Sequence, residues 1–170
     1  LGFSGVPGTG VGSAGPLVVL TSRQGASASE IFAAALQDYG RAVIVGDGST
    51  FGKGPVQTIL EIGRFTSLLG SRSQEDGALK LTIQKFYRVT GESTQRKGVN
   101  SDVVLNDFYT YSDIGERYDD NALAWDKIPA TSFQKSNAID IKKLEALSAA
   151  RMKKNEKYQL LLASAERKKS

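Results

Sequence analysis

Residues 17–45 read LVVLTSRQGASASEIFAAALQDYGRAVIV, and their pattern decides the fold. The apolar, β-branched run at 17–21 indicates a buried strand. After a turn at 22–28, residues 29–39 predict a helix with Ser29 as its N-cap, Gly40 at its C-terminal end and an apolar stripe of Ile31, Phe32, Ala35, Leu36 and Tyr39. Residues 42–45 predict a second buried strand. This order predicts a β-α-β unit with parallel strands, and therefore the α/β class.

The rest of the chain divides by composition and periodicity. Strands are expected at 56–62 and 79–89, a short apolar piece at 103–105 and an exposed excursion at 63–77. From residue 139 onward, apolar residues recur at helical spacing on a basic background. We therefore expect three parts: a Gly/Ser-rich linker or lead-in at 1–15, a core at 16–118 and a mainly helical C-terminal extension at 119–170.

Two absent residue types restrict the chemistry. The 170 residues include no cysteine and no histidine. The chain therefore has no thiol nucleophile, no thiolate or imidazole metal ligand and no Ser-His-Asp triad. For acyl transfer, a lysine is the remaining natural base. No cofactor is expected, and no spacing of carboxylates resembles a calcium loop.

Charge and hydropathy give no reason to expect a nucleic-acid or membrane partner. The net charge of +4 is modest, and the basic residues gather toward the C-terminus without interleaved aromatics, which favours a solvated helix face over a nucleic-acid surface. The apolar run at 17–20 has the length of a strand and is too short to cross a bilayer. No membrane span is expected.

Ser27 is the first candidate catalytic residue. It lies in the turn between a strand and a helix, where an α/β sheet presents ligands at the carboxyl ends of its strands. Unpaired amides at the start of the helix could face an oxyanion, and the N–H of Ala28 is the natural donor. The alternative is that Ser27 and Ser29 are ordinary helix caps.

Lys53 is the second candidate. Gly52 and Gly54 on either side allow close approach of other backbone, and the apolar neighbours Phe51 and Val56 can desolvate the ammonium, which favours the neutral amine that accepts a proton. The alternative is a lysine in a flexible glycine loop. A phosphate-binding P-loop is excluded, because the glycine spacing is wrong and no Ser or Thr follows the lysine.

These residues lie within motifs of a known family. GASASEI at 25–31, QDYGRA at 37–42 and FGKGPVQ at 51–57 resemble the signature of the tail-specific, or C-terminal processing, peptidases. LTIQKFYRV at 81–89, STQRKGV at 93–99 and DNALAWD at 120–126 are similar to the long bacterial branch. The resemblance implies that Ser27 is the nucleophile, that Lys53 is the general base and that Gln57 orients the lysine.

The resemblance also implies a context for the chain. It implies a crotonase-like α/β core, of which residues 16–118 are the C-terminal part, with the first half of the core and a PDZ domain expected in the full-length protein. It further implies a periplasmic or otherwise extracytoplasmic endopeptidase whose substrates are unfolded or C-terminally tagged polypeptides with apolar C-termini. The alternative is a catalytically incompetent fragment that acts as a peptide-binding or assembly module.

Overall fold

The computed structural model describes residues 15–63, 77–136 and 139–167. Its elements, in chain order, are β1 (Val18–Thr21), α1 (Ala28–Asp38), β2 (Val43–Gly46), β3 (Pro55–Glu61), β4 (Ala78–Lys85), β5 (Val103–Val104), the 3-10 helix η1 (Glu116–Tyr118), α3 (Ile141–Lys154) and α4 (Glu156–Glu166). The predicted α/β class with C-terminal helices is confirmed, and the predicted helix at 29–39 is α1 displaced by one residue.

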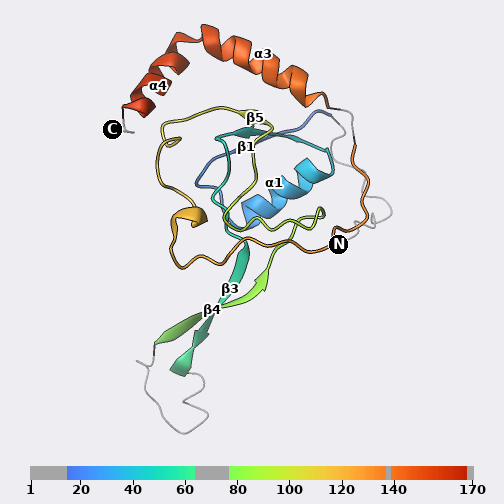
Figure 1. The fold of residues 1–170 in the computed structure, drawn as a ribbon, viewed down its shortest axis with the longest axis vertical. Coiled ribbons are helices and arrows are strands. Elements are labelled where there is room, and N and C mark those ends of the chain that lie inside the picture. Colours follow the sequence, from blue (N-terminus) through green and yellow to red (C-terminus); the bar gives the residue numbers. More distant parts are fainter. Residues whose placement is uncertain (1–14, 64–76, 137–138, 168–170) are drawn as a thin grey trace.

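A parallel sheet forms the centre of the molecule (Figure 1). The strand order is β1-β2-β5, with Val18 opposite Val43 and Val45 opposite Val103. The helix α1 connects β1 to β2, so the predicted β-α-β unit is present. Within the described residues, β1 has no strand partner on its outer side.

The core is small and lies between α1 and β2. Ala33, Ala34, Ile44 and Val99 are buried, and Val19 and Phe86 pack against them. The two alanines have short side chains, which lets the helix approach the sheet closely. Ile44 is fully buried in the central strand, so its whole side chain contributes to the apolar burial of the core.

The helix α1 does not bury the apolar stripe that the sequence predicts. Its buried residues are Glu30, Ala33, Ala34 and Asp38, whereas the stripe residues Ile31, Phe32 and Tyr39 are exposed. The two buried carboxylates are tolerated because both are hydrogen-bonded: Asp38 pairs with Arg88 at 2.5 Å, and Glu30 binds backbone amides of a loop described below. Helical periodicity located the helix but assigned the wrong face to the core.

The prediction of a buried first strand is wrong for one face of β1. Val18 is 56% exposed and Leu20 is 79% exposed, whereas the alternate residues Val19 and Thr21 are partly buried. Val18 and Leu20 project from the same face of the strand, and the described part of the chain places nothing over that face. The strand β2, which lies between two neighbours, begins with two buried residues.

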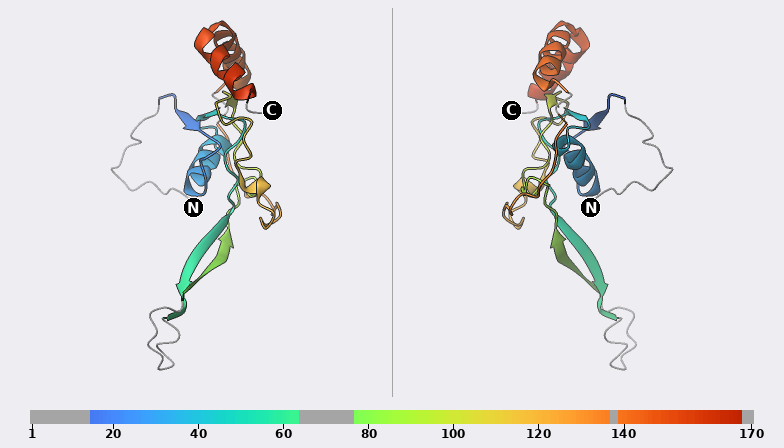
Figure 2. Two further views of the ribbon diagram at one scale, coloured as in Figure 1. Left: turned by 90° about the vertical axis from the view of Figure 1, so that its left-hand side faces the viewer. Right: turned by 90° about the vertical axis from the view of Figure 1, so that its right-hand side faces the viewer.

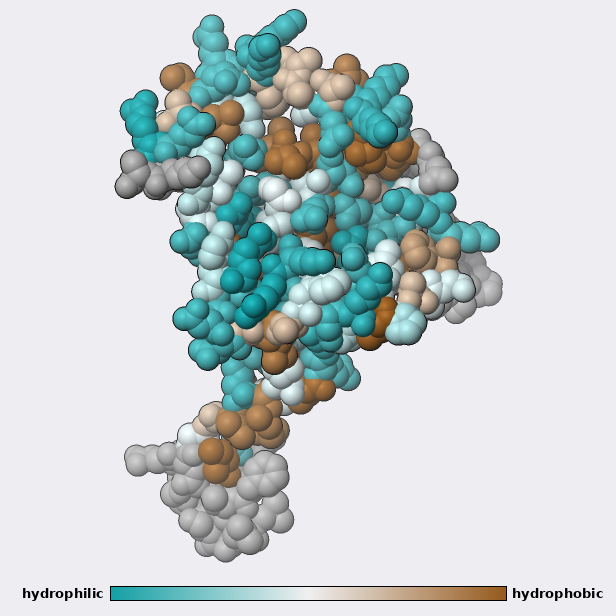
Figure 3. Space-filling view, viewed as in Figure 1, coloured by the Kyte–Doolittle hydropathy of each residue, from teal (hydrophilic) through white to brown (hydrophobic). Residues whose placement is uncertain are grey.

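Strands β3 and β4 form a separate antiparallel hairpin that projects from the body of the molecule (Figures 1 and 2). The register shifts at Val56 and Gln57, which marks a bulge at the base of the hairpin. Apolar side chains gather on this arm (Figure 3), and Ile59 and Ile83 are more than half exposed. The predicted excursion at 63–77 and the predicted lead-in at 1–15 lie almost entirely outside the described residues.

The C-terminal helices lie at the end of the molecule opposite the hairpin (Figure 2). The helix α3 contacts β5, and Ala165 of α4 is fully buried. Burial raises the pKa of the Tyr158 phenol, which agrees with docking of α4 near Asn106 and Asp107.

The helical part of the C-terminal region begins at Ile141, and residues 119–136 before it cross the body without regular structure. In the described part of the chain, no helix has both the length and the apolarity that a bilayer crossing requires.

Replacement of Ile44 tests the location of the core. Ile44→Ala is expected to lower the free energy of unfolding by about 2–5 kcal/mol, because it leaves a cavity beneath α1. The matched control is Leu20→Ala in the same sheet, which is expected to change it by less than about 0.5 kcal/mol because Leu20 is mostly exposed. Urea unfolding of the two variants measures both values, and equal losses would contradict this core.

Candidate functional site

Ser27 occupies a strained position at the N-terminal end of α1. It follows the carboxyl end of β1, its side chain is exposed, and its backbone has φ 57° and ψ −116°. An ordinary N-cap residue has β-region dihedral angles, and a non-glycine residue with positive φ is uncommon. Backbone strain of this kind is concentrated at functional sites. The geometry therefore favours the catalytic interpretation of Ser27 over that of an ordinary cap.

The carboxylate of Glu30 is the centre of the site. Glu30 is fully buried in the first turn of α1. Its Oε1 accepts the hydroxyl of Thr50 at 2.5 Å and the N–H of Gly52 at 2.7 Å. Its Oε2 accepts the N–H groups of Ser27 and Lys53, each at 2.9 Å. These four donors satisfy a buried charge that would otherwise be very costly.

This shared acceptor brings the two candidate residues together. The backbone nitrogens of Ser27 and Lys53 both bind the same oxygen atom, so they cannot lie farther apart than twice 2.9 Å. The N–H of Phe51 also donates to the carbonyl of Gly25 at 2.9 Å. This hydrogen bond is a second link between the turn of Ser27 and the loop of Lys53. Residues separated by a helix and a strand in the sequence therefore meet at one point.

The glycines beside Lys53 are required by close backbone contacts. Gly52 has φ +93°, and a Cβ atom there would lie 2.9 Å from the carbonyl carbon of Arg96. A Cβ atom on Gly54 would lie 2.9 Å from the Cβ of Gln95. Gln95 is fully buried, and its side-chain oxygen accepts the N–H of Gly54 at 2.9 Å. The loop of Lys53 is thus held by Glu30 on one side and by residues 93–96 on the other.

No hydrogen bond in the described structure joins the side chains of the remaining candidate residues to this junction. The Lys53 side chain is half-buried, and within the described ranges its ammonium makes no ion pair or hydrogen bond. Gln57 is exposed on β3, next to the register shift at the base of the hairpin. The N–H of Ala28, the first residue of α1, has no partner inside the helix and lies at its positive end.

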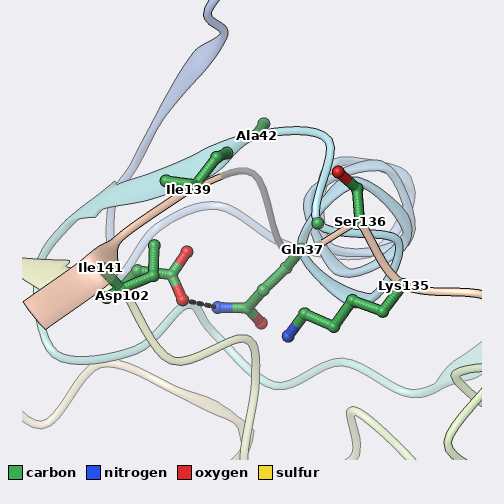
Figure 4. Close-up of a pocket in the computed structure, with 8 residues that line it drawn as sticks. Gln37, Ala42, Asp102, Lys135, Ser136, Ile139 and Ile141 are labelled. Atoms are coloured by element: carbon green, nitrogen blue, oxygen red, sulfur yellow. Dashed lines mark hydrogen bonds between the residues drawn. The ribbon is translucent and has the colours of Figure 1, made fainter.

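A cavity lies away from these residues (Figure 4). Its lining includes Gln37 and Asp102, whose side chains hydrogen-bond at 2.8 Å, and the side chain of Lys135. Gln37 is near the C-terminal end of α1, whereas Ser27 precedes its N-terminal end, so this cavity is not part of the candidate site. No group of three or more metal-ligating side chains was found among the described residues.

Sequence reasoning missed two residues that shape the site. Glu30 stands three residues after Ser27, and this spacing is that of a capping box, so a signal for its contact with Ser27 N–H was present. Its contacts with Thr50, Gly52 and Lys53 were not readable, because they join separate segments. Gln95 gave no local signal, since its role depends on Gly54, which is distant in the sequence.

Comparison with known proteins gives a consistent assignment along the chain. Residues 6–105 match the model of peptidase family S41, and residues 109–170 match the model of the C-terminal domain of tail specific protease. The first match includes Ser27, Lys53, Gln57 and Ala28. The second begins after β5 and includes both C-terminal helices.

Individual relatives agree with these matches. The chain is 48% identical over 126 residues to the tail-specific protease of Haemophilus influenzae, which covers 74% of this chain and 18% of that protein. It is 46% identical over 90 residues to the carboxy-terminal-processing protease of Bartonella bacilliformis, which covers 53% of this chain and 18% of that protein. A solved photosystem II D1 C-terminal processing protease is 35% identical, with a TM-score of 0.44 over 55% of this chain and 21% of its own. The chain thus spans about a fifth of the length of these relatives.

Two glycines of one loop provide a matched test of the packing around Lys53. Gly54→Ala is expected to lower the free energy of unfolding by about 1–3 kcal/mol, because the new methyl group would collide with Gln95 and with the hydroxyl of Ser93. Gly48→Ala is expected to change it by less than about 0.5 kcal/mol, because no atom lies within 4 Å of the added Cβ. Thermal or urea unfolding distinguishes the two, and a neutral Gly54→Ala would show that the loop is not clamped.

Proposed function

The chain belongs to peptidase family S41, and we propose that it contributes a Ser-Lys dyad that cleaves polypeptides. Ser27 is the nucleophile and Lys53 is the general base. In the proposed dyad Gln57 orients Lys53 by accepting a hydrogen bond from its Nζ on the side-chain amide oxygen, a contact that the described structure does not contain, and the N–H of Ala28 is one donor to the oxyanion. The observation that carries the proposal is the shared hydrogen bonding of Ser27 and Lys53 to Oε2 of Glu30.

The proposed reaction proceeds by acyl transfer. The Oγ of Ser27 forms a bond to the peptide carbonyl carbon while its proton passes to the neutral Nζ of Lys53. The oxyanion is stabilised by the N–H of Ala28 at the positive end of α1. The C–N bond then breaks, and Lys53 returns the proton to the leaving amine. A water molecule, deprotonated by Lys53, hydrolyses the acyl-enzyme and releases Ser27.

Two features support these roles. The strained backbone of Ser27 presents an exposed side chain at the start of a helix, which is the arrangement that a nucleophile elbow uses. Lys53 makes no ion pair within the described structure, and an ammonium bound to a carboxylate would be a poorer base. Gln57 follows Lys53 by four residues along backbone that becomes the extended strand β3.

The substrate and location follow from the relatives and are part of the proposal. The relatives' names describe tail-specific and carboxy-terminal processing, so we expect unfolded or C-terminally tagged polypeptides with apolar C-termini as substrates. We also expect a PDZ domain and the first half of the peptidase core in the full-length protein, and a periplasmic or otherwise extracytoplasmic location.

A second candidate function is peptide binding or assembly without cleavage. The outer edge of β1, which no described strand pairs, and the exposed Leu20 favour it, because an unpaired strand edge can accept another polypeptide strand. The two functions differ in one observable result. Binding of an unfolded, apolar-tailed peptide that remains intact supports the second, whereas cleavage that depends on Ser27 supports the first.

Three substitutions in the full-length protein test the dyad. Ser27→Ala is expected to lower kcat at least about a thousandfold, since the nucleophile is lost. Lys53→Ala is expected to lower it by about 10²–10⁴-fold, and Gln57→Ala by about 10–100-fold, because the base is removed or misoriented. Cleavage of an unfolded, apolar-tailed protein measures all three. Normal activity of Lys53→Ala would show that another group is the base.

The pH dependence of covalent labelling tests the base independently of peptide binding. A fluorophosphonate probe should label Ser27 faster as the pH rises, because only a neutral amine accepts the proton of the serine. The rate of labelling, followed by mass spectrometry of the modified peptide, gives the profile. A rate that does not change with pH, or modification of another residue, would contradict the proposal.

A further inference from the structure

We propose that residues 110–126, here called the strap, are a positioning element of the catalytic site. This inference rests on the proposed function and extends it. The strap lies within the stretch that matches the C-terminal domain of tail specific protease, whereas Ser27 and Lys53 lie within the stretch that matches peptidase family S41. The strap is thus outside the catalytic motifs in sequence but is bonded to the segments that hold them.

The first half of the strap binds both sides of the Ser27–Lys53 junction. On the side of the serine turn, the carbonyl of Ser112 accepts a hydrogen bond from Nη1 of Arg23 at 2.9 Å. On the side of the lysine loop, the N–H of Glu116 donates to the carbonyl of Phe51 at 2.9 Å, and Arg117 donates to the buried hydroxyl of Ser49. These contacts fix the chain on both sides of the Glu30 carboxylate.

Asp47 connects the serine turn, the lysine loop and the strap. It is almost fully buried, and its Oδ2 accepts the Nε of Arg23 at 2.7 Å. Its Oδ1 accepts the N–H of Gly48 at 2.7 Å and lies 3.4 Å from the hydroxyl of Thr110 in the strap. A buried, hydrogen-bonded ion pair requires well-defined geometry, so the serine turn, the lysine loop and the strap are held in one arrangement.

The second half of the strap binds the segment that packs on Gly52 and Gly54. The carbonyl of Leu123 accepts the Nε2 of Gln95 at 2.9 Å, and the carbonyl of Ala122 accepts the Nη2 of Arg96 at 2.7 Å. The indole of Trp125 donates to the carbonyl of Ser93 at 3.0 Å. Gln95 in turn binds the N–H of Gly54, so two hydrogen bonds connect the strap to the backbone beside Lys53.

Arg96 combines a left-handed backbone with a side-chain contact to the strap. It has φ 60°, in the left-handed region that favours glycine, and its N–H donates to the carbonyl of Gly52 at 2.8 Å. Glycine would fill this position without strain but could not reach the strap. The arginine side chain reaches the strap and donates a hydrogen bond to the carbonyl of Ala122, so the strained residue is also a link to the strap.

The end of the strap is anchored to the hairpin strand β4. The Nζ of Lys85 lies 2.6 Å from Oδ1 of Asp126, and the hydroxyl of Tyr87 donates to Oδ2 at 2.7 Å. These hydrogen bonds, from Lys85 first and Tyr87 second, lower the pKa of the Asp126 carboxyl. The strap therefore begins beside the serine turn and ends at the base of β4. Strand β4 pairs with β3, and β3 carries Gln57.

The test uses two strap contacts and one matched control in the full-length protein. Arg96→Gly relieves the left-handed strain but removes the bond to Ala122, and Arg117→Ala removes the bond to Ser49. The control Arg151→Ala removes an exposed arginine of α3, outside the strap. The measurements are the rate of fluorophosphonate labelling, kcat and KM for an unfolded polypeptide, and the melting temperature.

Arg96→Gly and Arg117→Ala are each expected to lower the labelling rate and kcat by about 10-fold or more, with KM within about 2-fold of wild type, because small displacements of catalytic groups are costly. The melting temperature of Arg96→Gly is expected to stay within about 4 °C of wild type, since relief of strain offsets the lost hydrogen bond. Arg96→Lys, which retains a cation able to reach Ala122, is expected to recover part of kcat. Arg151→Ala is expected to behave as wild type.

The outcomes separate this inference from the proposed function. If Ser27→Ala is inactive but both strap variants label and cleave at the wild-type rate, the strap inference is wrong and the dyad remains. If the wild-type protein is neither labelled nor active, both are wrong. If Arg117→Ala fails to fold, Arg96→Gly alone decides, because it does not depend on the same contact.

Discussion

The buried carboxylate of Glu30 is the interaction on which the rest of the site depends. It accepts four hydrogen bonds from two segments, the Ser27 turn and the loop from Thr50 to Lys53. A carboxylate without these donors would not be stable in a fully buried position, and the donors would have no partner without it. Helix α1 therefore turns a polar residue toward the core, and the two candidate catalytic residues meet as a consequence.

The same requirement explains the other features of the site. The lysine loop must run close to Glu30, so its opposite side is packed by residues 93–96, and glycine is needed at 52 and 54. The strap then binds both the loop and the segment that packs on it. A site held by backbone hydrogen bonds leaves the side chains of Ser27 and Lys53 available for chemistry. In the proposed mechanism, rigidity comes from groups that do not react.

Much of this arrangement could be predicted from local sequence, and the rest could not. The β-α-β unit, its helix limits and the C-terminal helices followed from apolar spacing and from glycine at the end of α1. The prediction failed where burial depends on distant partners. Phe32 is exposed although it lies on an apolar stripe, and Glu30 is buried although it is charged, because the loop donors hold the face of α1 that carries Glu30 against the rest of the molecule. Gln95 and Arg96 became relevant only once the fold placed them against Gly54 and Gly52.

The most direct test of the Glu30 account is the rate at which a fluorophosphonate labels Ser27 in Glu30→Gln. A glutamine presents an NH₂ group toward backbone donors, so it cannot accept all four hydrogen bonds. This variant is expected to be labelled at least about 10-fold more slowly than wild type. Glu145→Gln, which changes an exposed glutamate on α3, should be labelled at the wild-type rate. Labelling of Glu30→Gln at the wild-type rate would contradict the claim that this carboxylate sets the geometry of the site.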